Sequence, residues 1–85
     1  MTRIEIIEEL KDIILKAMGE EDPSIFDNCT EESQLTTDLG MTSINILFSI
    51  IAIEERFNIS FNEDGVEDFQ TVGDVVNYIE REMNE

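Results

Sequence analysis

The stretch "DLGMTSINILFSIIAIEERFNISF" (residues 38–61) decides the fold, because it joins a helix start to a long apolar helix. The "DLG" motif predicts a tight turn that presents the helix start to solvent. On a helical wheel drawn from Ser43 to Phe57, one apolar stripe marks the expected core face, formed by Ile46, Ile50, Ile53 and Phe57. A polar arc remains, formed by Asn45, Ser49 and Arg56.

A second apolar stripe lies well round the same helix and needs its own explanation. It consists of Ile44, Leu47, Phe48 and Ile51. Burial between the other helices would account for Leu47 and, in part, for the apolar character of Ile51. Ile44 and Phe48 lie on the side of the helix that faces away from the core stripe. We therefore expect partial burial together with an exposed patch for a partner at Ile44, Phe48 and Ile51.

Upstream, residues 2–18 predict an amphipathic helix that ends at Gly19 as a C-terminal cap. Its apolar residues recur at helical spacing, at Ile4, Ile7, Leu10, Ile14 and Ala17 or Met18. Three of the five basic residues lie in this helix among four carboxylates; they are Arg3, Lys11 and Lys16. The spacing of Glu to Lys favours solvent-facing pairs three or four positions apart.

Residues 19–42 contain the only proline, Pro23, and show no strong periodicity. They predict a long ordered loop with one short helical turn. We expect three apolar side chains to pin this loop to the core: Ile25, Phe26 and Leu35.

Downstream, "TVGDVVNYIEREM" (residues 71–83) predicts the last main helix, opened by a capping pair of Thr71 and Asp74. Its expected apolar stripe is Val72, Val75, Val76, Ile79 and Met83. A short helical turn is expected near Val66 to Phe69. The alternating "FNISF" is interpreted as loop, because no other strand could pair with it. The result is an all-α fold, a small helical bundle in a single domain over residues 1–85.

The bulk composition limits the partners. Among 85 residues, Asp and Glu outnumber Lys and Arg by 21 to 5, for a net charge of −16. Such a surface repels nucleic acid and anionic membranes and attracts basic proteins, although the charge also serves solubility alone. We expect no membrane insertion. The single cysteine, Cys29, and the lack of a charged and apolar leader predict a cytoplasmic protein.

The hydroxyl of Ser43 has two possible roles. At a helix start, Ser43 or Thr42 most often caps backbone N–H groups. The same helix end also favours a bound or attached phosphate, through its free N–H groups and its dipole. A phosphoryl group esterified to Ser43 would therefore be well placed.

The segments "DLGMTSINILFSIIAIEERFNI" and "FQTVGDVVNYI" resemble the acyl carrier proteins, and the resemblance covers Ile4 to Ile79. It implies a four-helix bundle with three main helices, one short helix and a long first loop. It also implies that Ser43 carries 4′-phosphopantetheine, which a phosphopantetheinyl transferase installs from coenzyme A. Acyl intermediates of a fatty-acid, polyketide or other specialised pathway would be attached to the thiol of this arm as thioesters.

The resemblance further implies a monomeric carrier that serves acyl-loading and acyl-processing enzymes and has no catalytic residue or metal of its own. The absence of histidine agrees, since no Ser-His or Cys-His relay can be built. Cys29 is then an inert or half-buried loop residue.

The sequence departs from the family pattern around the attachment site. Thr42 and Asn45 stand where Asp is usual, and Phe48 stands where Glu is frequent. Glu54 and Glu55 keep the acidic end of the helix. We therefore expect a specialised carrier whose partners contact Ile44, Phe48, Ile51, Glu54 and Glu55. In the family, the acyl chain can fold back between helices, and the candidates to line such a cavity are Ile46, Leu47, Ile50, Ile53 and Ile79.

Three alternatives stay open. An aminoacyl or peptidyl carrier shares the bundle and the modified serine. An unmodified acidic interaction module would use Ser43 only as a cap. The segment "SFNEDG" (residues 60–65) has part of a calcium-loop pattern, but Thr71 falls where the closing Glu belongs.

Overall fold

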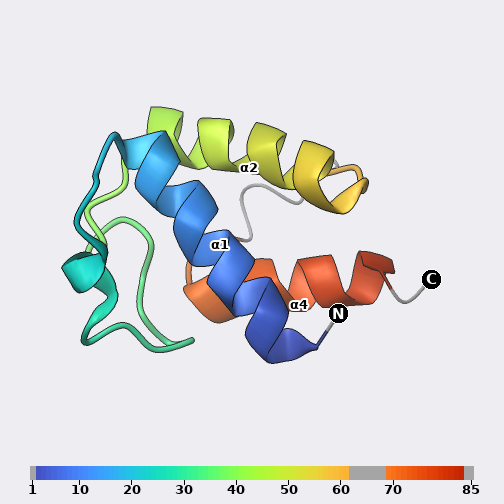
Figure 1. Ribbon diagram of the computed structural model, residues 1–85, viewed down its shortest axis with the longest axis horizontal. Helices are drawn as coiled ribbons and strands as arrows, with labels where there is room; N and C mark the ends of the chain where they lie inside the picture. Colours follow the sequence, from blue (N-terminus) through green and yellow to red (C-terminus); the bar gives the residue numbers. More distant parts are fainter. Residues whose placement is uncertain (1, 62–68, 84–85) are drawn as a thin grey trace.

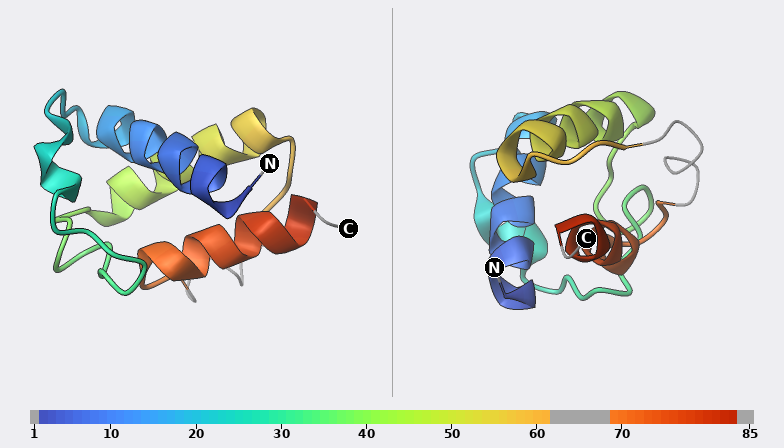
Figure 2. Two further views of the ribbon diagram at one scale, coloured as in Figure 1. Left: turned by 60° about the horizontal axis from the view of Figure 1, so that its bottom comes forward. Right: turned by 90° about the vertical axis from the view of Figure 1, so that its right-hand side faces the viewer.

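The computed structural model describes residues 2–61 and 69–83 and is all-helical over these ranges. Its elements are α1 (Arg3–Met18), the 3₁₀ turn η1 (Pro23–Phe26), α2 (Ser43–Phe57) and α4 (Val72–Met83). Helix α1 crosses over α2 and α4 and packs against both (Figure 1). The long connection from α1 to α2 wraps one end of the bundle (Figure 2). The predicted all-α bundle is confirmed, while the expected turn near Val66 lies outside the described residues.

Helix α1 ends at the predicted residue and begins one residue later than predicted, at Arg3, because Thr2 is its N-cap. Thr2 and Glu5 form a capping box in which the Glu5 N–H donates to Thr2 Oγ1 at 3.2 Å and the Thr2 N–H donates to Glu5 Oε1 at 2.9 Å. Gly19 ends the helix with φ of 70°, a left-handed conformation that glycine adopts without strain.

The predicted core stripe of α1 was partly wrong. Ile4 is 72% exposed and Ile7 is only half-buried, whereas the fully buried side chains are Ile6, Leu10, Ile13 and Ile14. The physical reason is that α1 lies against α2 and α4 at once, so the buried arc is centred between the two contacts. Periodicity alone does not reveal that centre, because isoleucine occurs both inside and outside it.

The long first loop is pinned to the core as expected. Phe26 and Leu35 are buried, and Ile25 is half-buried and packs against the hydrophobic core. Backbone hydrogen bonds also tie this loop to the start of α4: the Val72 N–H donates to Ser33 O at 3.0 Å, and the Gly73 N–H donates to Glu31 O at 2.8 Å. The loop is therefore part of the folded body, which holds the start of α2 in place.

Helix α4 confirms the predicted Thr71 and Asp74 capping pair, with the Asp74 N–H donating to Thr71 Oγ1 at 3.2 Å. Its buried face contains Val72, Val75, Val76 and Ile79. Met83, also predicted for this face, is 37% exposed at the C-terminal end of the helix. Tyr78 is buried instead, stacked on Phe61 at 4.5 Å between ring centroids.

Basic residues mostly join elements rather than pair within α1. Only Lys16 makes the predicted pair with the nearby Asp12, at 3.1 Å. Arg3 pairs with Glu31 of the loop and with Glu80 of α4, and Lys11 lies over the Phe26 ring. The expected local pair was therefore wrong for Lys11, and Arg3 meets carboxylates of the loop and α4 that helical spacing cannot show. Within residues 2–61 and 69–83, every helix is too short or too polar to cross a membrane.

Candidate functional site at the start of α2

Ser43 is the first residue of α2, and its side chain is exposed. The cap is its neighbour Thr42, whose backbone is extended and whose Oγ1 accepts from the Asn45 N–H at 3.1 Å. The Asn45 side chain completes a capping box by accepting from the Thr42 N–H at 3.0 Å. Among the described residues, no hydrogen bond involves the Ser43 hydroxyl. The interpretation of Ser43 as a cap is thus wrong, and its hydroxyl is available for chemistry.

The turn before Ser43 is held firmly in place. Gly40 has φ of 73°, a left-handed conformation that most side chains disfavour, and the residues on either side of it, Leu39 and Met41, are buried. The Met41 N–H donates to Leu35 O at 2.9 Å. The Asp38 carboxylate accepts from the Gln34 N–H at 2.7 Å. The predicted "DLG" turn is confirmed, and it presents Ser43 to solvent from an ordered base.

The surroundings of Ser43 suit a phosphate ester. In the described part of the chain, the backbone N–H groups of Ser43 and Ile44 have no acceptor, as is usual for the first residues of a helix. The first turn of α2 carries no acidic side chain, so nothing within it repels an anion. Two free donors at the positive end of a fifteen-residue helix favour a negatively charged group here.

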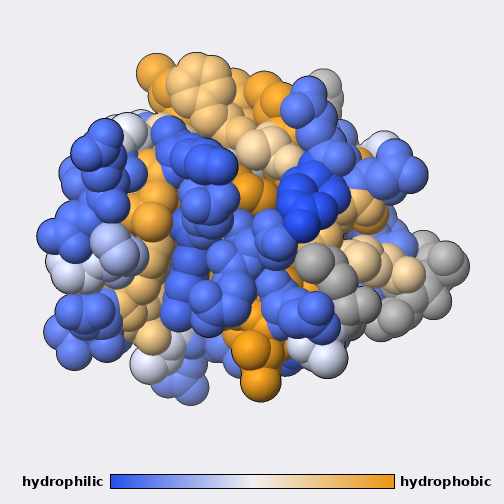
Figure 3. Space-filling model, in the orientation of Figure 1, coloured by the Kyte–Doolittle hydropathy of each residue, from blue (hydrophilic) through white to orange (hydrophobic). Residues whose placement is uncertain are grey.

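The second stripe of α2 forms an exposed apolar surface, which we name the outer face and define as Ile44, Leu47, Phe48 and Ile51. These side chains are between 48% and 62% exposed. Hydrophobic side chains gather along α2 in the space-filling view (Figure 3). The expected exposure of Ile44, Phe48 and Ile51 is confirmed. The expectation that Leu47 is core was wrong, because α1 packs against another side of α2 and leaves Leu47 53% exposed.

The two carboxylates near the end of α2, Glu54 and Glu55, have different surroundings. The Glu54 carboxylate is half-buried and accepts from the Phe61 N–H at 3.2 Å, so it holds the chain that follows the helix. Glu55 is exposed. Arg56, which follows them, pairs with Glu9 of α1 at 2.7 Å, and this contact raises the pKa of Arg56 above its ordinary value.

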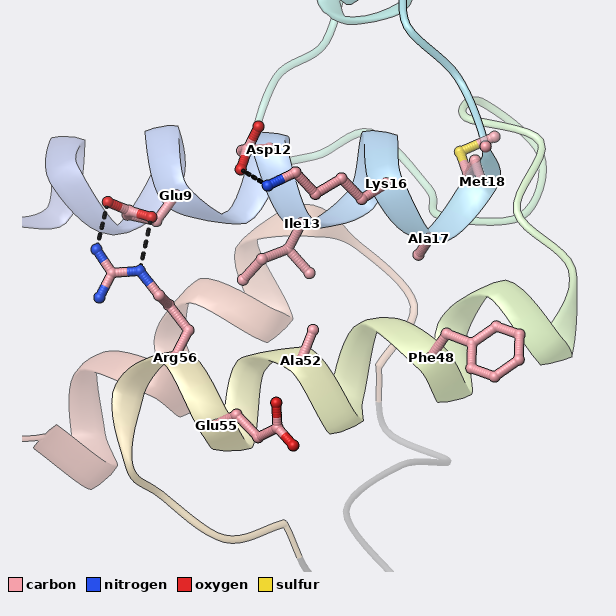
Figure 4. A pocket seen from close by; sticks show the side chains of 11 residues that line it. Glu9, Asp12, Ile13, Lys16, Ala17, Met18, Phe48, Ala52, Glu55 and Arg56 are labelled. Atoms are coloured by element: carbon pink, nitrogen blue, oxygen red, sulfur yellow. Dashed lines mark hydrogen bonds and ion pairs between the residues drawn. The ribbon is translucent and has the colours of Figure 1, made fainter.

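A groove of about 830 Å³ runs between α1 and α2 (Figure 4). Ile13 and Ala17 of α1 and Ala52 of α2 point into it, while the Glu9–Arg56 pair bridges the two helices at one end (Figure 4). Phe48 borders its other end, so the groove adjoins the outer face. Sequence reasoning missed this groove, since it depends on how the two helices cross.

An interior cavity of about 20 Å³ lies on the core side of α2. The predicted lining by Ile46, Ile50 and Ile53 is confirmed. The prediction was wrong for Leu47, which faces outward, and for Ile79, which is fully buried away from this cavity. Ser49, which the wheel placed on the polar arc, is only 5% exposed and lines the cavity. Its neighbours Asn45 and Arg56 face α1, where the Asn45 side-chain amide donates to Ala17 O at 3.2 Å.

Other candidate groups stay outside this site. Within residues 2–61 and 69–83 there is no group of three or more side chains that could hold a metal ion. Most of the calcium-like segment at residues 60–65 lies outside the described residues. Cys29 is half-buried in the first loop, as expected, with its Sγ 3.6 Å from Thr30 O.

The chain is similar to proteins of one known family. Residues 8–79 match the family model described as a phosphopantetheine attachment site. The chain is 31% identical to an acyl carrier protein of Exiguobacterium sibiricum, over 98% of this chain and 100% of that protein. It is 33% identical to one of Wolinella succinogenes, over 88% and 93% of the two chains. It is 32% identical to one of Thermotoga maritima, over 96% of both.

Proposed function

Because this chain belongs to the acyl carrier protein family and contains its phosphopantetheine attachment domain, we propose that Ser43 is the residue that bears the arm. Proteins of this family are carriers rather than catalysts. When bound, the arm supplies a thiol that holds acyl groups as thioesters. The chain itself positions the attachment hydroxyl, stabilises the charge beside it and offers surfaces to the enzymes that act on the cargo.

The observation that carries this proposal is that Thr42, and not Ser43, caps α2. Thr42 takes the capping role, so the neighbouring hydroxyl stays exposed and unbonded. The free N–H groups of Ser43 and Ile44 lie beside the position that a phosphodiester would occupy. A serine needed for the cap would lose a stabilising hydrogen bond when modified, whereas this serine loses none.

We further propose that the outer face and Glu55 form the partner surface, used by a phosphopantetheinyl transferase and by acyl-loading and acyl-processing enzymes. Apolar anchors surrounded by charge are typical of transient enzyme contacts. Of the two predicted carboxylates, Glu55 is the better candidate, because Glu54 already accepts from the Phe61 N–H. We infer a monomeric, single-domain carrier of the cytoplasm that has no catalytic role of its own.

We propose that the protein serves a specialised acyl pathway, such as fatty-acid or polyketide synthesis. The support comes from the outer face, where Phe48 offers an aromatic contact in place of a charge. The interior cavity beside Ile46 and Ile50 is proposed to receive part of the cargo. An aminoacyl or peptidyl carrier is the alternative within the same scaffold.

The test of the attachment site is an intact mass measured before and after incubation with coenzyme A and a broad-specificity phosphopantetheinyl transferase. The native chain is expected to gain the mass of one phosphopantetheine, and Ser43→Ala is expected to gain none. Ser24→Ala, which alters another exposed serine, serves as the matched control and should be modified like the native chain.

Unchanged mass with several transferases, in a chain shown to be folded, would contradict the proposal and leave an unmodified interaction module. Loading of the modified chain by an adenylating enzyme with an amino acid, but with no acyl group, would favour the aminoacyl carrier instead.

A further inference from the structure

The groove between α1 and α2 has two matched walls. Each wall is a row of residues spaced four apart, which places their side chains on one face of a helix. The row on α1 is Glu9, Ile13 and Ala17, and the row on α2 is Phe48, Ala52 and Arg56. Ala17 and Ala52 are the only two alanines of the chain, and both lie in these rows. Because their side chains are single methyl groups, the helices leave an open space of about 830 Å³ between them (Figure 4).

The two ends of this groove differ. At one end, the Arg56 guanidinium donates to the Glu9 carboxylate at 2.7 and 3.0 Å and bridges the two helices. The other end is bordered by Phe48, lies toward the start of α2 and adjoins the outer face. The groove is therefore open on the side of the proposed attachment residue and closed by an ion pair at the far end.

The interior of the bundle has too little room for a cargo chain. The interior cavity of about 20 Å³ holds one water-sized group, so it takes at most the end of an acyl chain. The groove is much larger, and its floor is apolar at Ile13, Ala17 and Ala52. Transfer of apolar carbon atoms from water to such a surface is favourable. A chain lying there would also cover Phe48, which is 54% exposed.

A phosphopantetheine arm on Ser43 is long enough to reach the open end of the groove. Phe48 follows Ser43 by five residues, a rise of about 7.5 Å, and lies roughly 140° round the helix. On a helix about 10 Å across, this makes a surface path of about 14 Å. The arm contains about fifteen bonds, equivalent to about five extended residues, and spans about 17 Å. The thioester therefore reaches Phe48, and the acyl carbons beyond it enter the groove.

The length of the groove sets how much of a chain it accepts. Arg56 follows Phe48 by eight residues, a rise of about 12 Å. An extended hydrocarbon chain advances about 1.3 Å per carbon, because its bonds of about 1.5 Å alternate in direction. About nine carbons therefore fit between the open end and the Glu9–Arg56 bridge.

We propose that the groove between α1 and α2 binds the acyl chain of the cargo and that the Glu9–Arg56 bridge limits the bound length to about nine carbons. This inference rests on the proposed carrier function and concerns chains that the interior cavity cannot hold. Ala52 and Arg56 are then specificity-determining residues, because Ala52 leaves the space that the chain occupies and Arg56 closes the far end.

The test uses the full chain carrying saturated acyl groups of four, eight and fourteen carbons, transferred to Ser43 from the corresponding acyl-coenzyme A. The rate of thioester cleavage by hydroxylamine, compared with the same acyl group on free pantetheine, measures how well each chain is protected. We expect the eight-carbon group to be protected about two- to tenfold better than the four-carbon group, because full burial of one methylene alone is worth a factor of about four. The fourteen-carbon group should gain little more, since its last carbons extend past the bridge.

Methyl NMR locates the chain directly, because the two alanine methyl groups report on the groove alone. We expect the resonances of Ala17 and Ala52 to shift when the eight-carbon group replaces the four-carbon group, while those of Ile50 and Ile53 in the core stay in place. Larger shifts at Ile50 and Ile53 than at the alanines would overturn the inference.

Two variants test the residues separately. Ala52→Leu fills the groove and is expected to reduce the protection of the eight-carbon group to that of the four-carbon group. Asn77→Leu adds the same side chain at an exposed position of α4 and should behave as the native chain. Arg56→Ala removes the bridge and is expected to protect the fourteen-carbon group about two- to tenfold better than the native chain does. Urea unfolding checks that each variant is folded.

Unchanged protection of the eight-carbon group in Ala52→Leu, or protection that does not depend on chain length in the native chain, would overturn the inference and leave the carrier function intact. Unchanged protection of the fourteen-carbon group in Arg56→Ala would overturn the length limit. A chain that accepts no arm at Ser43 would overturn the carrier function as well.

Discussion

At the scale of single residues, Thr42 caps α2 and leaves the hydroxyl of its neighbour Ser43 free for the proposed attachment. One hydroxyl could not serve both purposes. A capping side chain must leave its backbone extended, and Thr42 does so with φ of −87° and ψ of 169°. Ser43 is already helical and points outward. The Thr42 and Asn45 departures from the family pattern therefore preserve the helix start, because together they complete a capping box.

Glu31 is a residue whose protonation should change the stability of the fold. The Arg3 guanidinium hydrogen-bonds to it and lowers the pKa of Glu31 below its ordinary value of 4.5. A carboxyl with a lowered pKa stabilises the fold above the unfolded pKa, and this contribution is lost as the pH falls through the folded pKa. Both groups are partly exposed, so solvent screens the pair.

We therefore expect Glu31→Gln to be less stable than the native chain at neutral pH and equal to it well below pH 4.5. Urea unfolding at a series of pH values measures the difference in the free energy of unfolding. Glu32→Gln, the adjacent exposed carboxyl, is the control. A difference between native and Glu31→Gln chains that stays constant down to acid pH would show that the Arg3 contact is not the cause.

At the scale of the element, α2 has two apolar stripes with opposite uses. Ile50, Ile53 and Phe57 are buried against α1 and the core, while the outer face stays in solvent. A helix of this length needs only one stripe to dock in a small bundle. The second stripe is therefore better explained by partners than by folding.

Phe48→Glu is the informative change on the outer face. We expect the free energy of unfolding to change by no more than about 0.5 kcal/mol, since an exposed side chain leaves no cavity when replaced. We also expect acyl loading by a general fatty-acid enzyme with a basic surface to become faster, because the new carboxylate is attracted to it. Rates of acyl loading, together with urea unfolding, measure the two effects.

Ile4→Glu is the matched control, because it places the same charge at an exposed isoleucine of α1. An equal gain in both variants would mean that net charge alone matters. No gain in either would argue against the outer face as the partner surface.

At the scale of the whole molecule, self-repulsion is the dominant electrostatic feature. The net charge is −16, and the molecule measures 33 × 26 × 21 Å. The Debye length is about 30 Å at 0.01 M salt and about 8 Å at 0.15 M. At low salt, every pair of carboxylates on the molecule therefore interacts, whereas at physiological salt only neighbours do.

We expect the melting temperature to rise when sodium chloride is increased from about 0.01 M to about 0.15 M, because screening weakens repulsion among many carboxylates more than it weakens the few ion pairs. Thermal unfolding followed by circular dichroism measures the shift. A fall in melting temperature would instead mean that the contacts of Arg3 and Arg56 outweigh the repulsion.

Sequence alone was sufficient to predict the three main helices, the caps at Gly19 and Thr71, the turn before Ser43 and the exposure of Phe48. These features depend on neighbours within a few residues, such as Thr71 with Asp74, or on the period of one helix. The same local reasoning could identify Ser43 as the candidate attachment residue, because its place at the start of a helix is visible from the neighbouring residues.

The contacts of Arg3, the orientation of Asn45 and the burial of Ser49 follow from the tertiary structure alone. Each of these features depends on residues far apart in the sequence: Arg3 meets Glu80, and the Asn45 amide reaches Ala17. A wheel counts Ser49 as polar and assigns it to an open arc. Helix α1 crosses α2 along that arc and leaves Ser49 buried, because helices cover one another at angles that the spacing of one helix does not contain.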